Sequence, residues 1–138
     1  MTRSSLLALL ALLASVLGAT ATHADDPLRI VIEPPERLVA GSRGTITAVV
    51  HVAPDVPVLI TPNEEGTALF VVRGRLFRAD SEDPSASPLR FQIPIVTRQP
   101  GTAVIRVRAA SFECEGDDCR PVRGEASLTV RVEPAAVE

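Results

Sequence analysis

The sequence predicts an all-β protein, an immunoglobulin-like antiparallel β-sandwich, and three observations lead to this prediction. Apolar and polar residues alternate over most of the chain with a period of two, which is typical of strands with one buried and one solvent-exposed face. No amphipathic run of helical length interrupts this pattern. Turn-forming residues separate about six to eight short strands within about a hundred residues, a spacing that favours two packed antiparallel sheets.

The first half of the domain contains five predicted strands. The first alternates clearly and ends at Pro34-Pro35, because proline has no amide hydrogen to donate to a β-ladder. A turn at residues 41–44 precedes the second, whose polar face carries His51. The third lies among prolines and is expected at a sheet edge, and a turn is expected after it at residues 63–66. The five strands span residues 28–33, 45–52, 56–60, 67–72 and 74–77.

The second half of the domain contains one long loop and three predicted strands. Residues 78–87 carry almost no large apolar side chain and are expected to form a flexible surface loop. Pro94 lies inside the strand that follows, so one edge of that strand is expected to lack a complete ladder. The next strand follows a turn at Pro100-Gly101, and the last strand alternates most clearly. The three strands span residues 89–97, 103–112 and 126–133.

Residues 1–24 are interpreted as a cleaved signal peptide. Arg3 gives a positive start, residues 6–17 are apolar, and Thr22-His23-Ala24 places small residues where signal peptidase reads them. The apolar stretch is too short to span about 30 Å of hydrocarbon, so the mature protein is not expected to be inserted in a membrane. Residues 25–138 are then expected to form one domain, located in the periplasm if the source is a bacterium. Disulfides form and persist in that compartment.

The composition argues against several classes of function. The chain contains no Lys, and without Arg3 its thirteen Arg face 17 Asp and Glu, a net charge of −4. Such an acidic surface does not attract phosphate backbones, so no nucleic-acid partner is expected. His51 is the one histidine that remains after the leader, which argues against a zinc site or a Ser-His-Asp triad. No metal or cofactor is predicted.

Cys114 and Cys119 are the candidate functional residues. They flank a Gly-Asp-Asp turn between the last two strong strands, so they are expected to be neighbours in space. One interpretation is a structural disulfide that pins a hairpin of an exported domain. However, closing a loop of about six residues removes only about 2 kcal/mol of chain entropy from the unfolded state, little for a stabilising bridge. A short bridge across a tight turn is also expected to be strained and readily exchanged.

The local charge indicates how such an exchange would proceed. Glu113, Glu115, Asp117 and Asp118 surround the pair, and nearby arginines compensate only in part, so the thiolate form is expected to be disfavoured. The pair is therefore expected to act as a disulfide that a partner's reactive thiolate opens. The reduced pair would then pass its electrons to another protein.

These residues resemble a known family. The segment Leu89-Arg-Phe-Gln-Ile-Pro-Ile95, the strand after it, and Phe112-x-Cys114 with Cys119-x-Pro121 are similar to the amino-terminal periplasmic domain of the thiol:disulfide interchange protein DsbD. Residues 40–47 also resemble that family's second strand. The resemblance implies an immunoglobulin-like fold and electron transfer from a membrane-embedded donor to periplasmic disulfide proteins. It further implies that Cys119 meets the partner's sulfur and that Cys114 resolves the mixed disulfide.

The chain departs from this family in three respects. Its cysteines are separated by four residues, one fewer than in the best-known members. Residues 78–87 stand where the family has an aromatic cap loop that shields the cysteines, but they contain no Phe or Tyr. The chain is also expected to act as a stand-alone protein, without the membrane domain and the thioredoxin-like domain of full-length members.

Other charged clusters have simpler interpretations. Asp80, Glu82 and Asp83 are expected to lie in a solvated loop, since a Ca²⁺ site needs six or more oxygen ligands placed by a specific loop. Arg106, Arg108 and Arg131 are expected to pair with carboxylates across strands.

Three hypotheses for function therefore remain. The first is a periplasmic thiol–disulfide exchange module, with possible protein-disulfide reductase activity, that relays electrons between thioredoxin-like or membrane partners through Cys114 and Cys119. The second is a non-catalytic immunoglobulin-like binding or accessory domain with a structural disulfide. The third is a metallochaperone, a weaker hypothesis because two Cys without Met or His nearby leave a soft metal under-coordinated. The oligomeric state is not predicted.

Overall fold

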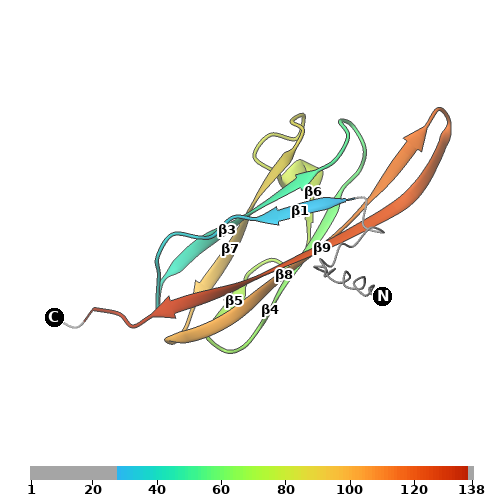
Figure 1. Cartoon of the computed structure of the whole chain (residues 1–138). Helices are drawn as coiled ribbons and strands as arrows, with labels where there is room; N and C mark the ends of the chain where they lie inside the picture. The colour runs from blue at the N-terminus through green and yellow to red at the C-terminus, as the bar shows by residue number, and fades with distance from the viewer. Residues whose placement is uncertain (1–27, 137–138) are drawn as a thin grey trace, which may run out of the picture.

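The computed structural model describes residues 28–136, which form an immunoglobulin-like β-sandwich (Figure 1). The signal peptide predicted at residues 1–24 lies outside the described residues. One sheet has four strands in the order β1 (Arg29–Ile32), β3 (Arg43–His51), β7 (Leu89–Thr97) and β5 (Leu69–Val71). The other has five in the order β2 (Leu38–Val39), β9 (Asp118–Glu133), β8 (Gly101–Glu115), β4 (Leu59–Glu65) and β6 (Leu76–Phe77). A 3-10 turn, η1 (Arg78–Asp80), follows β6.

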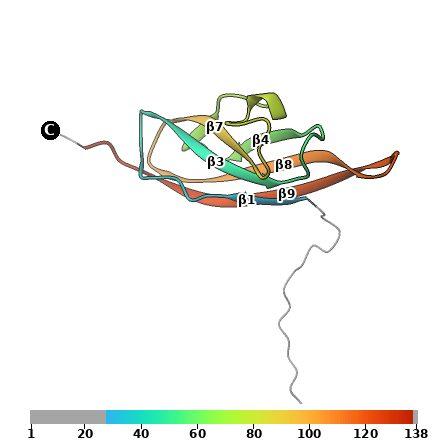
Figure 2. The same ribbon diagram turned by 90° about the horizontal axis from the view of Figure 1, so that it is seen from above.

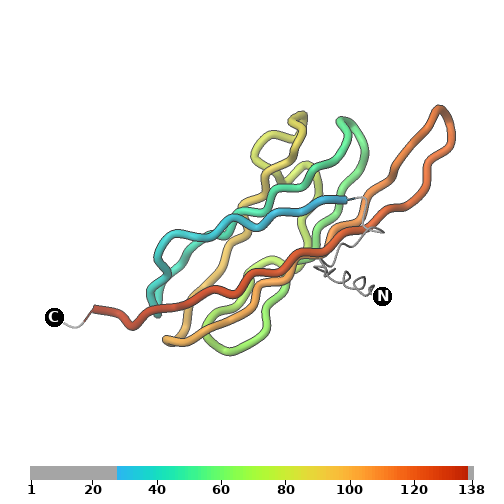
Figure 3. Tube along the Cα trace, in the orientation of Figure 1, coloured from blue at the N-terminus to red at the C-terminus, as the bar shows by residue number. Residues whose placement is uncertain are grey.

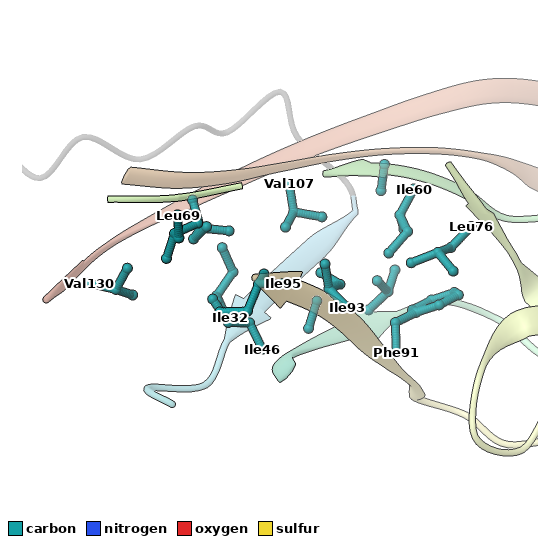
Figure 4. Close-up of a cluster of buried hydrophobic side chains, with 14 of the residues drawn as sticks. Ile32, Ile46, Ile60, Leu69, Leu76, Phe91, Ile93, Ile95, Val107 and Val130 are labelled. Carbon is teal, nitrogen blue, oxygen red and sulfur yellow. The ribbon is translucent and has the colours of Figure 1, made fainter. Parts of the chain in front are cut away.

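The core lies between the two sheets, as Figure 4 shows for its central side chains. The alternation predicted for residues 89–97 is confirmed by β7, whose Leu89, Phe91, Ile93 and Ile95 are almost completely buried. The inward positions of β8 follow the same pattern from Ala103 onward. Because each of these side chains removes apolar surface from water, the alternating strands supply the main favourable term of folding.

Two prolines lie inside strands, at points where an adjacent strand ends. Pro94 pairs with Thr45 of β3, and its carbonyl accepts a hydrogen bond from the Val72 amide just after β5 ends. Pro62 lies in β4 beyond Ile60, the last residue of that strand that pairs with β6. Both prolines therefore lie where the pairing with an adjacent strand has just ended.

Two expectations about β4 are wrong. The segment 56–60 was expected at a sheet edge, but Leu59 and Ile60 begin an inner strand between β6 and β8. Residues 63–66 were expected to form a turn, yet residues 63–65 continue this strand and pair with β8, and the turn begins at Gly66, with φ of 105°. The polar residues of this segment therefore belong to β4, and the ion pair between Glu65 and Arg106 of β8 stabilises the pairing of these two strands.

The short strand β2 was not predicted, and it pairs with the end of β9 in parallel. The sandwich is therefore antiparallel except at this one pair of the described strands. Ala40 then donates its amide hydrogen to the Glu133 carbonyl, which fixes the path of the chain from one sheet to the other.

The segment predicted as a flexible loop, residues 78–87, is tied to the domain by one arginine. The Arg78 guanidinium donates hydrogen bonds to the carbonyls of Ala53, Val56 and Pro84, at 2.9, 2.7 and 2.8 Å. Because five donors in a planar fork can serve several acceptors at once, this side chain joins the β3–β4 and β6–β7 connections.

Candidate functional site

The β8–β9 hairpin projects from one end of the sandwich (Figures 1 and 2). The pairing of β8 with β4 ends at Ala110, whereas its pairing with β9 continues to Glu115. Residues 111–115 and 118–122 therefore form a two-stranded ribbon without a third strand beside β8, visible at the upper right of Figure 3. All residues from 112 to 121 are exposed.

Cys114 and Cys119 form a disulfide near the tip of this ribbon, as their spacing predicted. The two residues are directly opposite each other in the ladder, and their Cα atoms are 4.0 Å apart. So short a separation is typical of a non-hydrogen-bonded antiparallel pair, in which the side chains lie close together on one face. The turn between the strands contains Gly116, whose φ of 60° suits a residue without a Cβ atom.

The ribbon has two chemically different faces, because successive side chains of a strand point to opposite sides. One face carries the disulfide and, two residues away on each strand, the paired Phe112 and Pro121. This is the face that the outward-pointing Arg106 and Arg108 of β8 also share. The residues of the resembling motif, Phe112-x-Cys114 and Cys119-x-Pro121, thus lie together on one face.

The opposite face of the ribbon carries the charged residues. Glu113, Glu115, Asp118 and Arg120 line a shallow hollow of about 200 Å³, to which Cys119 also contributes and Cys114 does not. Arg120 forms an exposed ion pair with Glu113 across the ladder, with 3.1 Å between Nη2 and Oε2. With Asp117 in the turn, four carboxylates and one guanidinium surround the tip, so its net charge is −3 (1 − 4).

Two contacts fix the base of the hairpin on the sandwich. The buried Ser111 hydroxyl donates a hydrogen bond of 2.7 Å to the Pro57 carbonyl. On β9, a Cβ atom at Gly124 would come within 2.3 Å of the Leu28 carbonyl oxygen. Only glycine at this position therefore allows the backbone of Leu28 to lie so close to β9. The direction in which the ribbon leaves the body is therefore set by packing on both strands.

The acidic loop residues do not form a common site. The pKa of Asp80 is lowered because its carboxylate accepts the Phe77 amide hydrogen and lies near Arg73. The pKa of Asp83 is lowered by hydrogen bonds from the Ser85 hydroxyl and amide. Glu82 instead contacts Arg90 and Gln92. Across residues 28–136, no group of three or more His, Cys, Asp or Glu is placed to hold a metal ion.

The arginines of the outer sheet face pair as the sequence predicted in two of three cases. Arg106 contacts Glu65 and Glu125, and Arg108 also contacts Glu125. These carboxylates raise the pKa of Arg106, the hydrogen bond to Glu65 being the largest cause. Arg131 has no carboxylate within ion-pair distance among the residues that the structure describes. His51 is exposed at the end of β3, which belongs to the other sheet from the strands that carry the cysteines.

Comparisons with known proteins bear on the fold. Neither the protein-family models nor the curated proteins give a match to this sequence. Among solved structures, the chain is similar to native alpha-2-macroglobulin from Escherichia coli, in a structure spanning domain MG7 to the C-terminus. The TM-score is 0.54 and the identity 16%, over 83% of this chain and 18% of that one. Trypsin-activated alpha-2-macroglobulin from the same organism gives a TM-score of 0.50 at 16% identity, over 79% of this chain and 7% of that one.

These similarities confirm the predicted fold class and do not extend to activity. At 16% identity they show a shared β-domain architecture, and this chain spans less than a fifth of either neighbour's length. The resemblance to the DsbD domain stays a prediction. Within the described part of the chain, no helix is long and apolar enough to cross a membrane.

Proposed function

We propose that this protein is an exported thiol–disulfide exchange module that relays electrons between partner proteins through Cys114 and Cys119. In a bacterium its compartment would be the periplasm, and its partners thioredoxin-like proteins or a membrane-embedded donor. The observation that carries the proposal is the position of the disulfide. It lies on an exposed ribbon beyond the last residue of β8 that pairs with β4, so no core side chain depends on it.

The proposed reaction is a pair of two-electron exchanges. A thiolate of the donor attacks Cys119 Sγ, the bond between the two sulfurs breaks, and Cys114 Sγ leaves as a thiolate and takes up a proton. The donor's second thiol then attacks its own sulfur in the mixed disulfide and releases Cys119, so that the donor becomes a disulfide and the pair a dithiol. The same steps in reverse order pass two electrons and two protons to the disulfide of a recipient.

The choice of Cys119 as the sulfur under attack is supported by the charges next to each cysteine. Cys114 lies between two carboxylates, Glu113 and Glu115, whereas Cys119 lies between Asp118 and Arg120. An incoming thiolate is repelled by like charge, so it approaches Cys119 at a lower electrostatic cost. The resemblance to the DsbD domain implies the same assignment.

The competing function is a binding domain whose disulfide only pins the hairpin. The two functions differ in the reduction potential of the bond. We would equilibrate the protein in glutathione buffers, alkylate free thiols, and determine the half-reduced point by mass spectrometry. Half reduction at a potential less negative than about −300 mV supports exchange, and a more negative value indicates a structural bond and contradicts the proposal.

A further inference from the structure

The geometry points to the outer face of the five-stranded sheet, beside the disulfide, as the docking surface for the protein that supplies the attacking thiol. This inference rests on the proposed function and adds the place and chemistry of the partner's contact. The surface is an apolar track that runs from β6 across β4 to the ribbon. It consists of Phe77, Leu59, Ala110, Phe112 and Pro121.

The register of the sheet places these side chains on one face. Leu59 of β4 is paired with Phe77 on one side and with Ala110 on the other. Phe112 lies two residues beyond Ala110 and so points to the same side, opposite Pro121 of β9. The adjacent residues on the same three strands confirm this orientation. They are Leu76, Ile60 and Ala109, which are paired with one another and buried on the inner face.

The track is exposed although it is apolar. Phe77 is 52% exposed and Phe112 43%, and they are two of the four large apolar side chains that are exposed among the described residues. A contiguous apolar area on a small domain commonly marks an interaction site. The other two exposed residues, Val31 and Val72, lie on or beside the strands of the opposite sheet.

The size of the surface fits a protein partner. Cys114 lies four positions beyond Ala110 along β8, a distance of about 14 Å, and two strand spacings separate β6 from β8, about 10 Å. A stable contact of about 800 Å² per partner covers both the disulfide and the track. A partner thiol positioned at Cys119 would therefore bring the surrounding partner surface over Phe112 and towards Phe77.

The charge around the track specifies the partner further. The end of the ribbon around the disulfide carries Glu113, Glu115, Asp117 and Asp118 against Arg120, a net charge of −3 (1 − 4). Those of them that lie in the strands point to the face opposite the track, so they act on an approaching partner through their electrostatic field and not by contact with the track. Arg123 lies opposite Ala110 and borders the track at the other end, and Arg108 on the same face is paired with Glu125, so the excess of carboxylates lies at the tip. The occupant is thus a protein whose reactive cysteine lies between an apolar patch, which covers the track, and a basic patch, which faces the tip.

Exchange rates with two synthetic peptides test this inference. Each peptide has nine residues with one cysteine in the centre and leucines before it. The residues after the cysteine are arginines in the first peptide and aspartates in the second. The protein, expressed with its own leader, is mixed with each peptide and with 2-mercaptoethanol, and rates are expressed per thiolate. We expect the arginine peptide to react at least about fivefold faster than the aspartate peptide at low salt, with the difference lost near about 0.5 M salt.

Substitutions separate docking from chemistry. Phe112→Ala and Phe77→Ala should each lower the rate of exchange with the arginine peptide about three- to tenfold. The control Val72→Ala changes a side chain that is 51% exposed but lies outside the track, and it should leave this rate unchanged. All variants should react equally with 2-mercaptoethanol. Equal rates for both peptides, or a loss of rate in Val72→Ala equal to that in the two Phe variants, would overturn the docking surface. Exchange with 2-mercaptoethanol would in that case still support the proposed function. A bond that none of the thiols opens would overturn both.

Discussion

The hydroxyl of Ser111 donates a hydrogen bond of 2.7 Å to the carbonyl of Pro57, and this contact marks the point where the hairpin leaves the sandwich. Ser111 is the last inward-pointing residue of β8 that is buried, at 4% exposure. The residue after it, Phe112, begins the exposed part of the ribbon. The bond therefore joins the base of the hairpin to the β3–β4 connection.

Replacing Ser111 by Ala should destabilise the domain. The substitution leaves the Pro57 carbonyl without its partner, which costs about 1–2 kcal/mol of unfolding free energy. The protein contains no Trp or Tyr, so urea unfolding is best followed by far-ultraviolet circular dichroism. Ser127→Ala on the exposed face of β9 is the control and should change the unfolding free energy by less than about 0.5 kcal/mol. Equal effects of the two substitutions would contradict the role assigned to this contact.

Removing both cysteines should leave the sandwich folded. In a Cys114→Ala/Cys119→Ala variant, the lost loop closure of about six residues lowers the unfolding free energy by at most about 2 kcal/mol. The circular dichroism spectrum of the folded state should be unchanged, because the core side chains lie outside residues 112–121. A variant that fails to fold would show that the bond is needed to hold the domain together.

The two cysteines should differ in reactivity when each is alone. Cys119 in a Cys114→Ser variant has one carboxylate and one guanidinium as neighbours, whereas Cys114 in Cys119→Ser has two carboxylates. The thiolate of Cys119 is therefore favoured, and we expect it to react several-fold faster with uncharged dithiodipyridine at pH 7. The reverse order would contradict the assignment of Cys119 as the residue that meets the partner.

Acid should weaken the contact between Glu33 and Arg90. Both carboxylate oxygens of Glu33 accept hydrogen bonds from the Arg90 guanidinium, at 2.9 and 3.0 Å, and this lowers the pKa of Glu33 below its ordinary value of 4.5. A carboxyl whose folded pKa is lowered stabilises the fold above its unfolded pKa and loses that contribution as the pH falls through the folded value.

The unfolding free energy of the native protein should therefore fall more steeply below about pH 4.5 than that of Glu33→Gln. Glu36→Gln removes an equal charge at an exposed position and should follow the native pH profile. Parallel profiles for the native protein and Glu33→Gln would show that the ion pair does not contribute.

The strand pattern was predictable wherever alternation is continuous. Residues 89–97 and the inward positions of residues 103–109 follow one period of two, and the structure places them as predicted. Residues 63–65 were wrongly predicted as part of a turn because Asn63 and Gly66 are typical turn residues, and their pairing with β8 depends on a strand about 40 positions away. The two-residue strand β2 is too short to show any period.

The candidate site was predictable in its residues but not in its setting. The Gly-Asp turn between two strands predicted that Cys114 and Cys119 would be neighbours. The projection of the ribbon depends on where β4 stops pairing with β8, which no local pattern encodes. The placement of Phe77 and Phe112 on one face is likewise a result of the register between three strands.

A redox titration with two readouts tests the account most directly. The protein is equilibrated across a series of glutathione buffers, and each sample is divided between alkylation with mass spectrometry and far-ultraviolet circular dichroism. We predict that the pair becomes half reduced at a potential less negative than about −300 mV, while the β-sheet signal stays constant throughout. A more negative midpoint, or a sheet signal that disappears together with the bond, would contradict the account.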